Sequence, residues 1–318
     1  MRLPGRILDR VTPPGFRSGF ACFVGRPNAG KSTLTNALVG QKVAITSDRP
    51  QTTRHAIRGI VTREDGQLVL VDTPGLHRPR TLLGQRLNDV VAGTLSEVDV
   101  VGMCLPAPDR IGPGDRWIAT QLAGLPADVP KVAIVTKTDI AQPARVVEQL
   151  AGAAELATEL DFEWAEIVPV SAVSGEQVSL LADLLLAQVP EGPMMYPDGE
   201  LTDAPEELAI AELVREAALD GVRDELPHSL AVVVEEMLPR PDRPADDPLL
   251  EVRCTLYVER DSQKGIVIGR GGARLAAVGT RARAGIEALL GTRVHLDVHV
   301  KVAKDWQRDP RQLNKLGF

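Results

Sequence analysis

The chain has 318 residues, of which 44% are apolar and only 3% aromatic, and its formal net charge is −7. This length predicts two domains, and the longest apolar runs fall short of a membrane span, so the composition argues against an integral membrane protein. The first residues lack the apolar region of a signal peptide, and the three cysteines lack the paired spacing of a disulfide framework or a zinc site. We therefore expect a soluble, cytoplasmic protein.

The charge is unevenly distributed along the chain. Residues 251–318 carry 13 Lys and Arg against 7 Asp and Glu, whereas the preceding residues carry 23 against 36. Such asymmetry indicates an acidic body followed by a basic module that could attract a polyanion such as a nucleic acid. A basic face that is merely solvated is the alternative.

After a loose lead-in over residues 1–17, the first motif is a glycine-rich loop that reads G-x-x-x-x-G-K-S over residues 25–32. It follows an apolar run, Phe20–Val24, and precedes a stretch with helical character, Thr33–Val39. This strand–loop–helix order predicts a phosphate-binding loop, in which backbone amides at a helix N-terminus surround an anion. Lys31 is expected to reach the terminal phosphates, and the Ser32 hydroxyl to bind Mg²⁺.

Short aliphatic runs alternate with helical stretches from residue 18 to about residue 190. Because their hydrophobicity is continuous rather than alternating, we predict strands that are buried on both faces in a doubly wound, mostly parallel sheet. A hairpin turn is predicted at Asp65-Gly66, after the strand Arg54–Thr62. The predicted strands are Phe20–Val24, Arg54–Thr62, Leu68–Val71, Val98–Leu105, Val132–Val135 and Ile167–Val170.

Polar clusters follow three of these strands, at the edge where such a sheet binds ligands. Asp72-Thr73-Pro74-Gly75 is suited to a second contact with Mg²⁺ through Asp72 and to a γ-phosphate contact through the Gly75 amide. Thr136-Lys137-Thr138-Asp139 is suited to reading guanine, because the Asp139 carboxylate can accept hydrogen bonds from its ring N–H and exocyclic amine. The Lys137 stem could lie along the base, and the Ala172 amide of Ser171-Ala172 could meet the guanine oxygen.

Residues 191–204 are rich in Pro, Gly and acidic side chains and are predicted to link the first domain, 18–190, to a second, 205–318. The second domain is predicted to have the order helix–strand–strand–loop–helix–strand. Its helices are expected over Pro205–Leu226 and Ala273–Leu290, and its strands over Ala231–Glu236, Glu251–Val258 and Val294–Val302, with a hairpin over Pro239–Pro248. The loop Gly269-Arg270-Gly271-Gly272 is a G-x-x-G pattern, which can press its backbone against a nucleic-acid backbone. The basic residues around it, together with the loop, form the predicted RNA-binding set: Lys264, Gly269, Arg270, Gly271, Gly272, Arg274, Arg281, Lys301 and Lys304.

These motifs resemble those of Era-type ribosome-assembly GTPases, within the TrmE-Era-EngA-like superfamily. The resemblance rests on residues 25–33, 50–55, 72–75 and 171–172, on residues 223–229, and on the stretch from Val300 to Phe318. It implies a P-loop GTPase domain followed by an α+β type II KH domain. It also implies GTP hydrolysis to GDP with Lys31, Gly75 and the switch residue Thr53, which would bind Mg²⁺ together with Ser32 and Asp72; Thr52 is the competing candidate. The nucleotide-binding residues that it implies are Gly25, Arg26, Pro27, Asn28, Ala29, Gly30, Lys31, Ser32, Thr33, Asp72, Thr73, Pro74, Gly75, Leu76, Thr136, Lys137, Thr138, Asp139, Ser171 and Ala172.

Two positions depart from what related GTPases contain. The family usually has Asn at the position of Thr136, which keeps a hydroxyl but loses an amide donor, so a contact to the base or to the phosphate loop is expected to weaken. Leu76 stands where Ras-like enzymes place a glutamine that orients water, so slow intrinsic hydrolysis is expected. Related GTPases with the asparagine found at Asn28 use it to hold K⁺, which makes K⁺ a second candidate cofactor.

The resemblance implies a monomer that binds small-subunit (16S) rRNA through its KH domain and assists assembly of the 30S ribosomal subunit. Trp306 could stack on a base of that RNA or pack in the core of the domain. Family members also associate peripherally with the inner membrane. The rival interpretation is therefore a membrane-surface or regulatory GTPase whose second domain binds a protein, although the acidic body disfavours anionic lipids.

Overall fold

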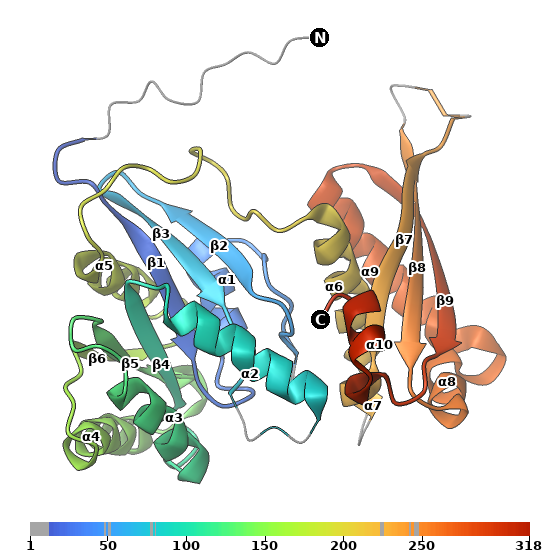
Figure 1. Cartoon of the computed structure of the whole chain (residues 1–318). Coiled ribbons are helices and arrows are strands. Elements are labelled where there is room, and N and C mark those ends of the chain that lie inside the picture. The colour runs from blue at the N-terminus through green and yellow to red at the C-terminus, as the bar shows by residue number, and fades with distance from the viewer. Residues whose placement is uncertain are drawn as a thin grey trace. The chain divides into compact units, whose positions relative to one another are not determined.

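The computed structural model describes residues 13–47, 49, 52–76, 79, 81–222, 226–241, 243–244 and 248–318. The chain divides into two compact units, and each is described by itself (Figure 1). The first unit runs to Ala44 and continues through His55–His77 and Asp89–Asp203. The second contains Ile45–Arg54, Arg78–Asn88 and Ala204–Phe318. In the parts that the structure describes, no helix is long and apolar enough to cross a bilayer.

The first unit contains a six-stranded sheet in the order β2-β3-β1-β4-β5-β6. All neighbouring strands are parallel except β2, which pairs antiparallel with β3. The strands are β1 (Arg17–Val24), β2 (Ile57–Thr62), β3 (Gly66–Asp72), β4 (Val100–Pro106), β5 (Lys131–Thr136) and β6 (Glu166–Val170). The predicted doubly wound, mostly parallel sheet is confirmed.

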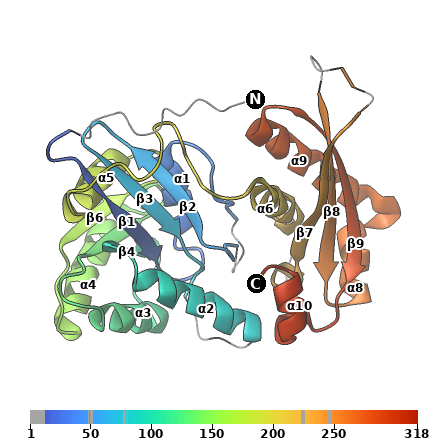
Figure 2. The same ribbon diagram turned by 45° about the horizontal axis from the view of Figure 1, so that its top comes forward.

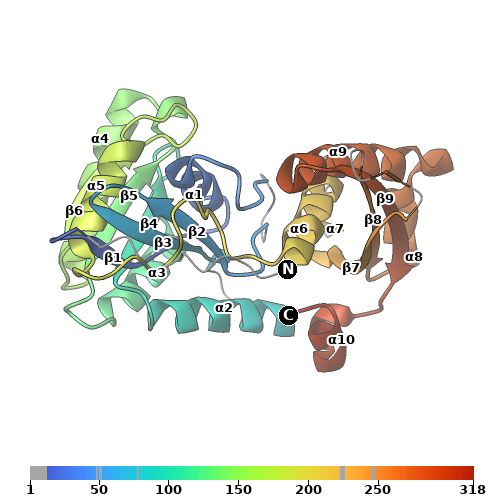
Figure 3. The same cartoon turned by 90° about the horizontal axis from the view of Figure 1, so that it is seen from above.

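Helices cover both faces of this sheet. On one face, α1 (Lys31–Val39) and α5 (Val178–Gln188) bury Leu34, Leu38, Leu181 and Leu185 against alternate residues of the strands. On the other face lie α3 (Pro113–Ala123), α4 (Pro143–Glu159) and the second half of α2 (Leu82–Leu95). A short 3₁₀ turn, η1 (Thr138–Ile140), precedes α4. Figure 3 shows α1 and α2 on opposite sides of the sheet. Because both faces are covered, the central strand β4 is apolar and buried along its whole length, as its sequence predicted, whereas β2 at the edge keeps Arg58 exposed.

The second unit contains a three-stranded sheet, β7 (Ala231–Pro239), β8 (Leu249–Val258) and β9 (Arg293–Val302), side by side in that order (Figure 2). β7 is antiparallel to β8, whereas β9 is parallel to it. Side chains from α6 (Glu206–Leu219), α8 (Asp261–Ile268) and α9 (Ala273–Leu290) pack with alternate residues of β8 in one core. The remaining elements are α7 (Leu226–Ser229), the 3₁₀ turns η2 (Arg270–Gly272) and η3 (Trp306–Arg308), and α10 (Pro310–Lys315).

A second apolar cluster of this unit gathers residues that are distant in the sequence. Trp306 lies fully buried there with Tyr257 of β8, Leu313 of α10 and Leu83 and Leu87 from the first half of α2. Its indole N–H donates to the Ser229 carbonyl at 3.1 Å, and its ring stacks on Phe318 with centroids 5.6 Å apart. Of the two roles considered for Trp306, the structure therefore supports core packing.

Two sequence predictions need correction, and a third point that the sequence left open is decided. β2 begins at Ile57 rather than Arg54, because the Arg54 side chain is buried in the second unit. The helix expected over Pro205–Leu226 ends at Leu219, and the chain turns at Gly221, whose positive φ of 67° favours glycine. The apolar stretch before the G-x-x-G loop is helical, in α8. Residues 1–12, 50–51 and 223–225 and part of the 239–248 hairpin lie outside the described residues.

Candidate nucleotide site and RNA interface

The loop between β1 and α1 has the backbone shape that an anion requires. Asn28 and Gly30 adopt left-handed conformations, with φ of 63° and 94°, between residues of ordinary backbone. Alternation of this kind turns successive amide groups toward one side of the chain and forms a concave nest for an anion. The nest opens at the N-terminus of α1, where the helix dipole adds positive potential.

Lys31 is buried in this loop, with 6% of its surface exposed. Its Nζ donates to the carbonyl oxygens of Gly25 and Arg26, both at 3.3 Å. Burial lowers the pKa of Lys31, and the nearby Asp72 carboxylate partly opposes that shift. An ammonium group already removed from water and held by two carbonyl oxygens is well suited to bind a phosphate oxygen.

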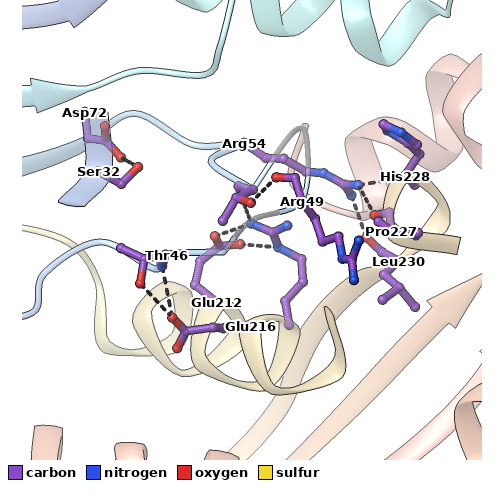
Figure 4. A network of polar contacts seen from close by, with 12 residues as sticks. Ser32, Thr46, Arg49, Arg54, Asp72, Glu212, Glu216, Pro227, His228 and Leu230 are labelled. Carbon is purple, nitrogen blue, oxygen red and sulfur yellow. Dashed lines mark hydrogen bonds and ion pairs between the residues drawn. The ribbon is translucent and has the colours of Figure 1, made fainter. Parts of the chain in front are cut away.

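Ser32 and Asp72 meet beside the same loop. The Ser32 hydroxyl donates to Asp72 Oδ2 at 2.7 Å (Figure 4), and Asp72 is fully buried at the end of β3. Its neighbour Thr73 is fixed by a hydroxyl hydrogen bond to the Phe23 carbonyl at 2.8 Å. A hydroxyl and a carboxylate are hard oxygen ligands that suit Mg²⁺, so these two residues fit the ion that the sequence motifs imply. A bound Mg²⁺ would neutralise charge that develops on the phosphates.

Gly75 lies directly against the phosphate loop. A Cβ atom at this position would come within 2.9 Å of the Pro27 nitrogen and 3.0 Å of its Cα, so only glycine allows this approach. Pro74 lies between Thr73 and Gly75 in the same buried turn, and Thr33 is partly buried in the first turn of α1. The next residue, Leu76, is 7% exposed and packs into the core cluster that contains Val24 and Val71. Its side chain therefore offers no polar group to a water molecule at the phosphates.

Thr136 connects the base-reading segment to the phosphate loop. Its hydroxyl donates to the Ala29 carbonyl at 2.7 Å, and the residue is 4% exposed. The replacement of the usual Asn by Thr thus retains a hydrogen bond to the phosphate loop. Whether a contact to the base is weakened stays a prediction.

The side chain of Asp139 is oriented by a buried serine. Ser171 Oγ donates to Asp139 Oδ1 at 2.7 Å and accepts from the Ser174 amide at 3.1 Å. Asp139 itself is exposed, as a residue that contacts a ligand should be, and Ala172 is partly buried next to it. Lys137 has a left-handed backbone, and Thr138 begins the short turn η1 that carries Asp139. The structure thus brings together the predicted base-reading residues.

The predicted switch residue Thr53 belongs to the second unit, within the segment Ile45–Arg54. Thr52, beside it, accepts a hydrogen bond at its carbonyl from Arg215 of α6, and Arg215 forms a buried ion pair with Glu212 at 2.6 Å. The Thr46 amide donates to Glu216 at 2.9 Å. The structure does not assemble Thr53 with Ser32 and Asp72 within one unit, and its contact with Mg²⁺ stays a prediction.

Arg54, in the same segment, forms three further hydrogen bonds within the second unit. Its buried guanidinium donates to the carbonyls of Leu230 at 2.5 Å, His228 at 2.7 Å and Pro227 at 3.1 Å (Figure 4). Its Cζ lies 5.6 Å from the Trp306 ring centre. Burial and the neighbouring Arg215 lower the pKa of Arg54 to about 9.

The glycine loop of the second unit is open to approach. Gly269, Gly271 and Gly272 have positive φ values of 72°, 57° and 80°, and a Cβ added at Gly271 or Gly272 would meet nothing within 4 Å. Arg270 is exposed between them. Lys301 and Lys304, near the end of β9, are also exposed, and Lys264 on α8 is partly buried. The loop therefore presents bare backbone next to positive charge.

Arg274 and Arg281, both on α9, already have partners. Arg274 donates to the carbonyl of Asp220 at 2.6 Å, at the C-terminal end of α6, and Arg281 forms an ion pair with the Asp220 carboxylate. Arg281 also lowers the pKa of Asp220. An RNA phosphate would have to compete with this carboxylate for Arg281, and both predicted RNA contacts stay predictions.

Sequence reasoning missed Asp115, a residue of α3 that contacts the phosphate loop through Arg26 at 2.7 Å. The start of α3 can be predicted from Gly112-Pro113-Gly114-Asp115, because Pro at the first helical position and Asp in the first turn are typical of helix N-termini. Its contact with Arg26, which lies 89 residues earlier in the chain, cannot be predicted from any local sequence pattern.

Comparison with known proteins gives concordant results. A family model described as 50S ribosome-binding GTPase matches residues 20–137, and a KH domain model matches residues 225–307. GTPase Era of Streptomyces coelicolor is 69% identical over 302 residues, covering 95% of each chain. GTPase Era of Mycolicibacterium smegmatis is 67% identical, covering 95% of this chain and 99% of that protein.

Two solved structures resemble nearly the whole chain. Era in complex with MgGDPNP and nucleotides 1506–1542 of 16S ribosomal RNA is 35% identical with a TM-score of 0.89, covering 95% of this chain and 99% of that one. A point variant of Aquifex aeolicus Era bound to GDP·AlF4⁻ is 34% identical with a TM-score of 0.88 and the same coverage.

The sheet, the phosphate loop and the match to a GTPase family model define a P-loop GTPase, and the second unit adds a KH domain. The identity shared with its relatives over nearly the full length then settles the family. The chain belongs to the GTPase Era family.

Proposed function

We propose that this GTPase binds 16S rRNA close to its 3′ end through the Gly269–Gly272 loop and assists assembly of the 30S subunit. The observation that carries the proposal is the open glycine loop with positive φ values, which presents the exposed Arg270. The 35% identical Era structure that contains nucleotides 1506–1542 of that RNA supports the choice of RNA. The protein would act in the cytoplasm, as a monomer with Mg²⁺ and GTP.

Crosslinking of the protein to RNA in living cells tests this function. We expect the crosslinked fragments to concentrate near the 3′ end of 16S rRNA. Fragments spread evenly over all cellular RNA, or none above background, would contradict it. The second outcome would favour the rival membrane-surface or protein-binding GTPase, including peripheral association with the inner membrane.

The segment Ile45–Arg54 supports a function as a switch. Its chain neighbours belong to the first unit, whereas Thr46, Thr52 and Arg54 are hydrogen-bonded within the second. If Thr53 binds Mg²⁺ when GTP is present, the segment Ile45–Arg54 would be held both by that ion and by its hydrogen bonds within the second unit. The contacts at Thr52 and Arg54 would then carry the nucleotide signal to the second unit.

RNA affinity measured with GDP and with a non-hydrolysable GTP analogue tests this coupling. We expect the two affinities to differ by about 10-fold in the wild type, a typical allosteric coupling. Thr53→Ala should make them equal, whereas Thr52→Ala should leave the difference. The reverse result would assign the switch function to Thr52, and equal affinities in the wild type would contradict the coupling.

K⁺ is proposed as a further cofactor, because the left-handed backbone of Asn28 holds that residue at the edge of the phosphate nest. A cation there would stabilise the negative charge that develops on the phosphates, in a site where the Leu76 side chain offers no polar group. We expect GTP turnover to be about 10-fold faster in KCl than in NaCl, the rate that about 1.4 kcal/mol of transition-state stabilisation gives. Equal turnover in the two salts would remove K⁺ from the mechanism.

A further inference from the structure

Arg26 is the second residue of the phosphate loop, yet its guanidinium points to a helix of the same unit. Its Nε donates to Asp115 Oδ1 at 2.7 Å, and its Nη2 lies 3.4 Å from Asp109. Its stem crosses the backbone of Gly114, where an added Cβ would lie 3.1 Å from Arg26 Cδ. An arginine so close to the phosphates could have stabilised their charge directly, but its side chain is held on α3.

Both carboxylate oxygens of Asp115 accept hydrogen bonds from other parts of the chain. The residue is 1% exposed, and Oδ2 accepts the Gly112 amide at 2.9 Å at the start of α3. Oδ1 is the carboxylate oxygen that Arg26 contacts, and the two oxygens thus hold two different parts of the chain. The side chain of Asp109, by contrast, is 57% exposed and lies at the longer distance. Because a hydrogen bond between charged groups is stronger out of water, Asp115 dominates the anchoring of Arg26.

The backbone of Arg26 in turn forms part of the phosphate nest. Its carbonyl accepts from Lys31 Nζ at 3.3 Å and from the Ala29 amide at 3.2 Å. The left-handed residue Asn28 lies within that turn. Fixing the Arg26 side chain therefore fixes the turn that supplies inward-facing amides and the resting position of Lys31.

We propose that Asp115 is a positioning residue for nucleotide binding, acting through Arg26 on the phosphate loop. Its buried carboxylate holds Arg26 on α3 and so keeps the loop in its binding shape before the nucleotide arrives. Preorganisation of this kind lowers the cost of binding and slows release.

A double-mutant cycle on the release rate of a fluorescent GDP analogue tests the proposal in the full-length protein. Asp115→Asn keeps the shape of the side chain, and its amide oxygen can still accept from Gly112, but its NH₂ group would face Arg26. We expect Asp115→Asn and Arg26→Gln each to speed release about 10-fold, the value of one charge-assisted hydrogen bond. The double variant should release no faster than either single one, and Asp109→Asn should stay within about twofold of the wild type.

Two results would overturn the proposal. If Asp115 acted only by capping α3, the effects of Asp115→Asn and Arg26→Gln would multiply in the double variant. If Arg26→Gln alone left release unchanged, the loop would not depend on this anchor. The second measurement remains decisive even if Asp115→Asn fails to fold, since Arg26 takes no part in the cap of α3.

Discussion

Asp139→Asn should convert this guanine-nucleotide enzyme into one that prefers xanthine nucleotides. The carboxylate of Asp139 is suited to accept from both the ring N–H and the exocyclic amine of guanine. An amide offers one acceptor and one donor, so the guanine amine would face an NH₂ group. Xanthine carries a carbonyl oxygen at that position and accepts from the new donor.

The hydrogen bond from Ser171 makes the direction of this change definite. Ser171 Oγ donates to Asp139 Oδ1 at 2.7 Å, and it is itself fixed by the Ser174 amide. In the Asn variant the amide oxygen should keep this bond, because an NH₂ group would oppose the serine hydrogen. The nitrogen then takes the place of Oδ2, the oxygen that Ser171 does not contact, and is expected to donate to the xanthine oxygen.

Competition binding of GDP and XDP measures the effect. We expect the ratio of their affinities to change by about 1,000-fold, since a buried polar mismatch on one side and a new bond on the other together amount to about 4 kcal/mol. Asp139→Asn combined with Ser171→Ala is the matched control, and its change should be smaller because the amide can rotate. Retained preference for GDP in the single variant would contradict the base-reading function of Asp139.

Much of this fold could be predicted because its signals are local. The central strands are continuous apolar runs. For β3, β4, β5 and β6, both ends of the observed strand lie within about two residues of the predicted ends, and β1 ends at the predicted residue. α9 coincides with the predicted helix Ala273–Leu290. The phosphate loop was predictable for the same reason, since the turn, the lysine and the helix that follows it are adjacent in sequence.

The errors arose where distant residues decide the outcome. Arg54 begins an apolar alternation that resembles a strand, but carbonyls at Pro227, His228 and Leu230 hold its guanidinium in the second unit. The ion pair of Arg26 with Asp115 and the orientation of Asp139 by Ser171 also join residues far apart in the chain. No periodicity or motif records these pairs, because each forms only after the sheet has placed its loops on one edge.

Replacement of both Gly271 and Gly272 by Asp should abolish RNA binding while GTP binding is unchanged. The two positions have open space around them and left-handed backbone, which Asp tolerates better than most residues, so the loop should keep its fold. Each new carboxylate would stand where the loop meets an RNA phosphate. At about 5 Å in a partly wet interface, the repulsion amounts to about 3 kcal/mol, or about two orders of magnitude in affinity.

The Gly271→Asn, Gly272→Asn variant separates charge from bulk. Asn has nearly the same size and the same tolerance of left-handed backbone, but it carries no charge. If phosphate contact is what the loop provides, the Asn variant should lose much less affinity than the Asp variant, and the difference should shrink as salt is raised. Equal losses in the two variants would indicate a steric requirement for bare backbone instead.

Two measurements test these variants: their affinity for a fragment from the 3′ end of 16S rRNA, and their yield of RNA crosslinks in cells. Their affinity for GDP is the internal control. Gly271 and Gly272 belong to the second unit, whereas Lys31, Asp72 and Asp139 belong to the first, so a change in GDP affinity would indicate general unfolding. Undiminished RNA binding by the Asp variant would show that the loop does not touch RNA. The basic residues near the end of β9, Lys301 and Lys304, would then be the remaining candidates for the interface.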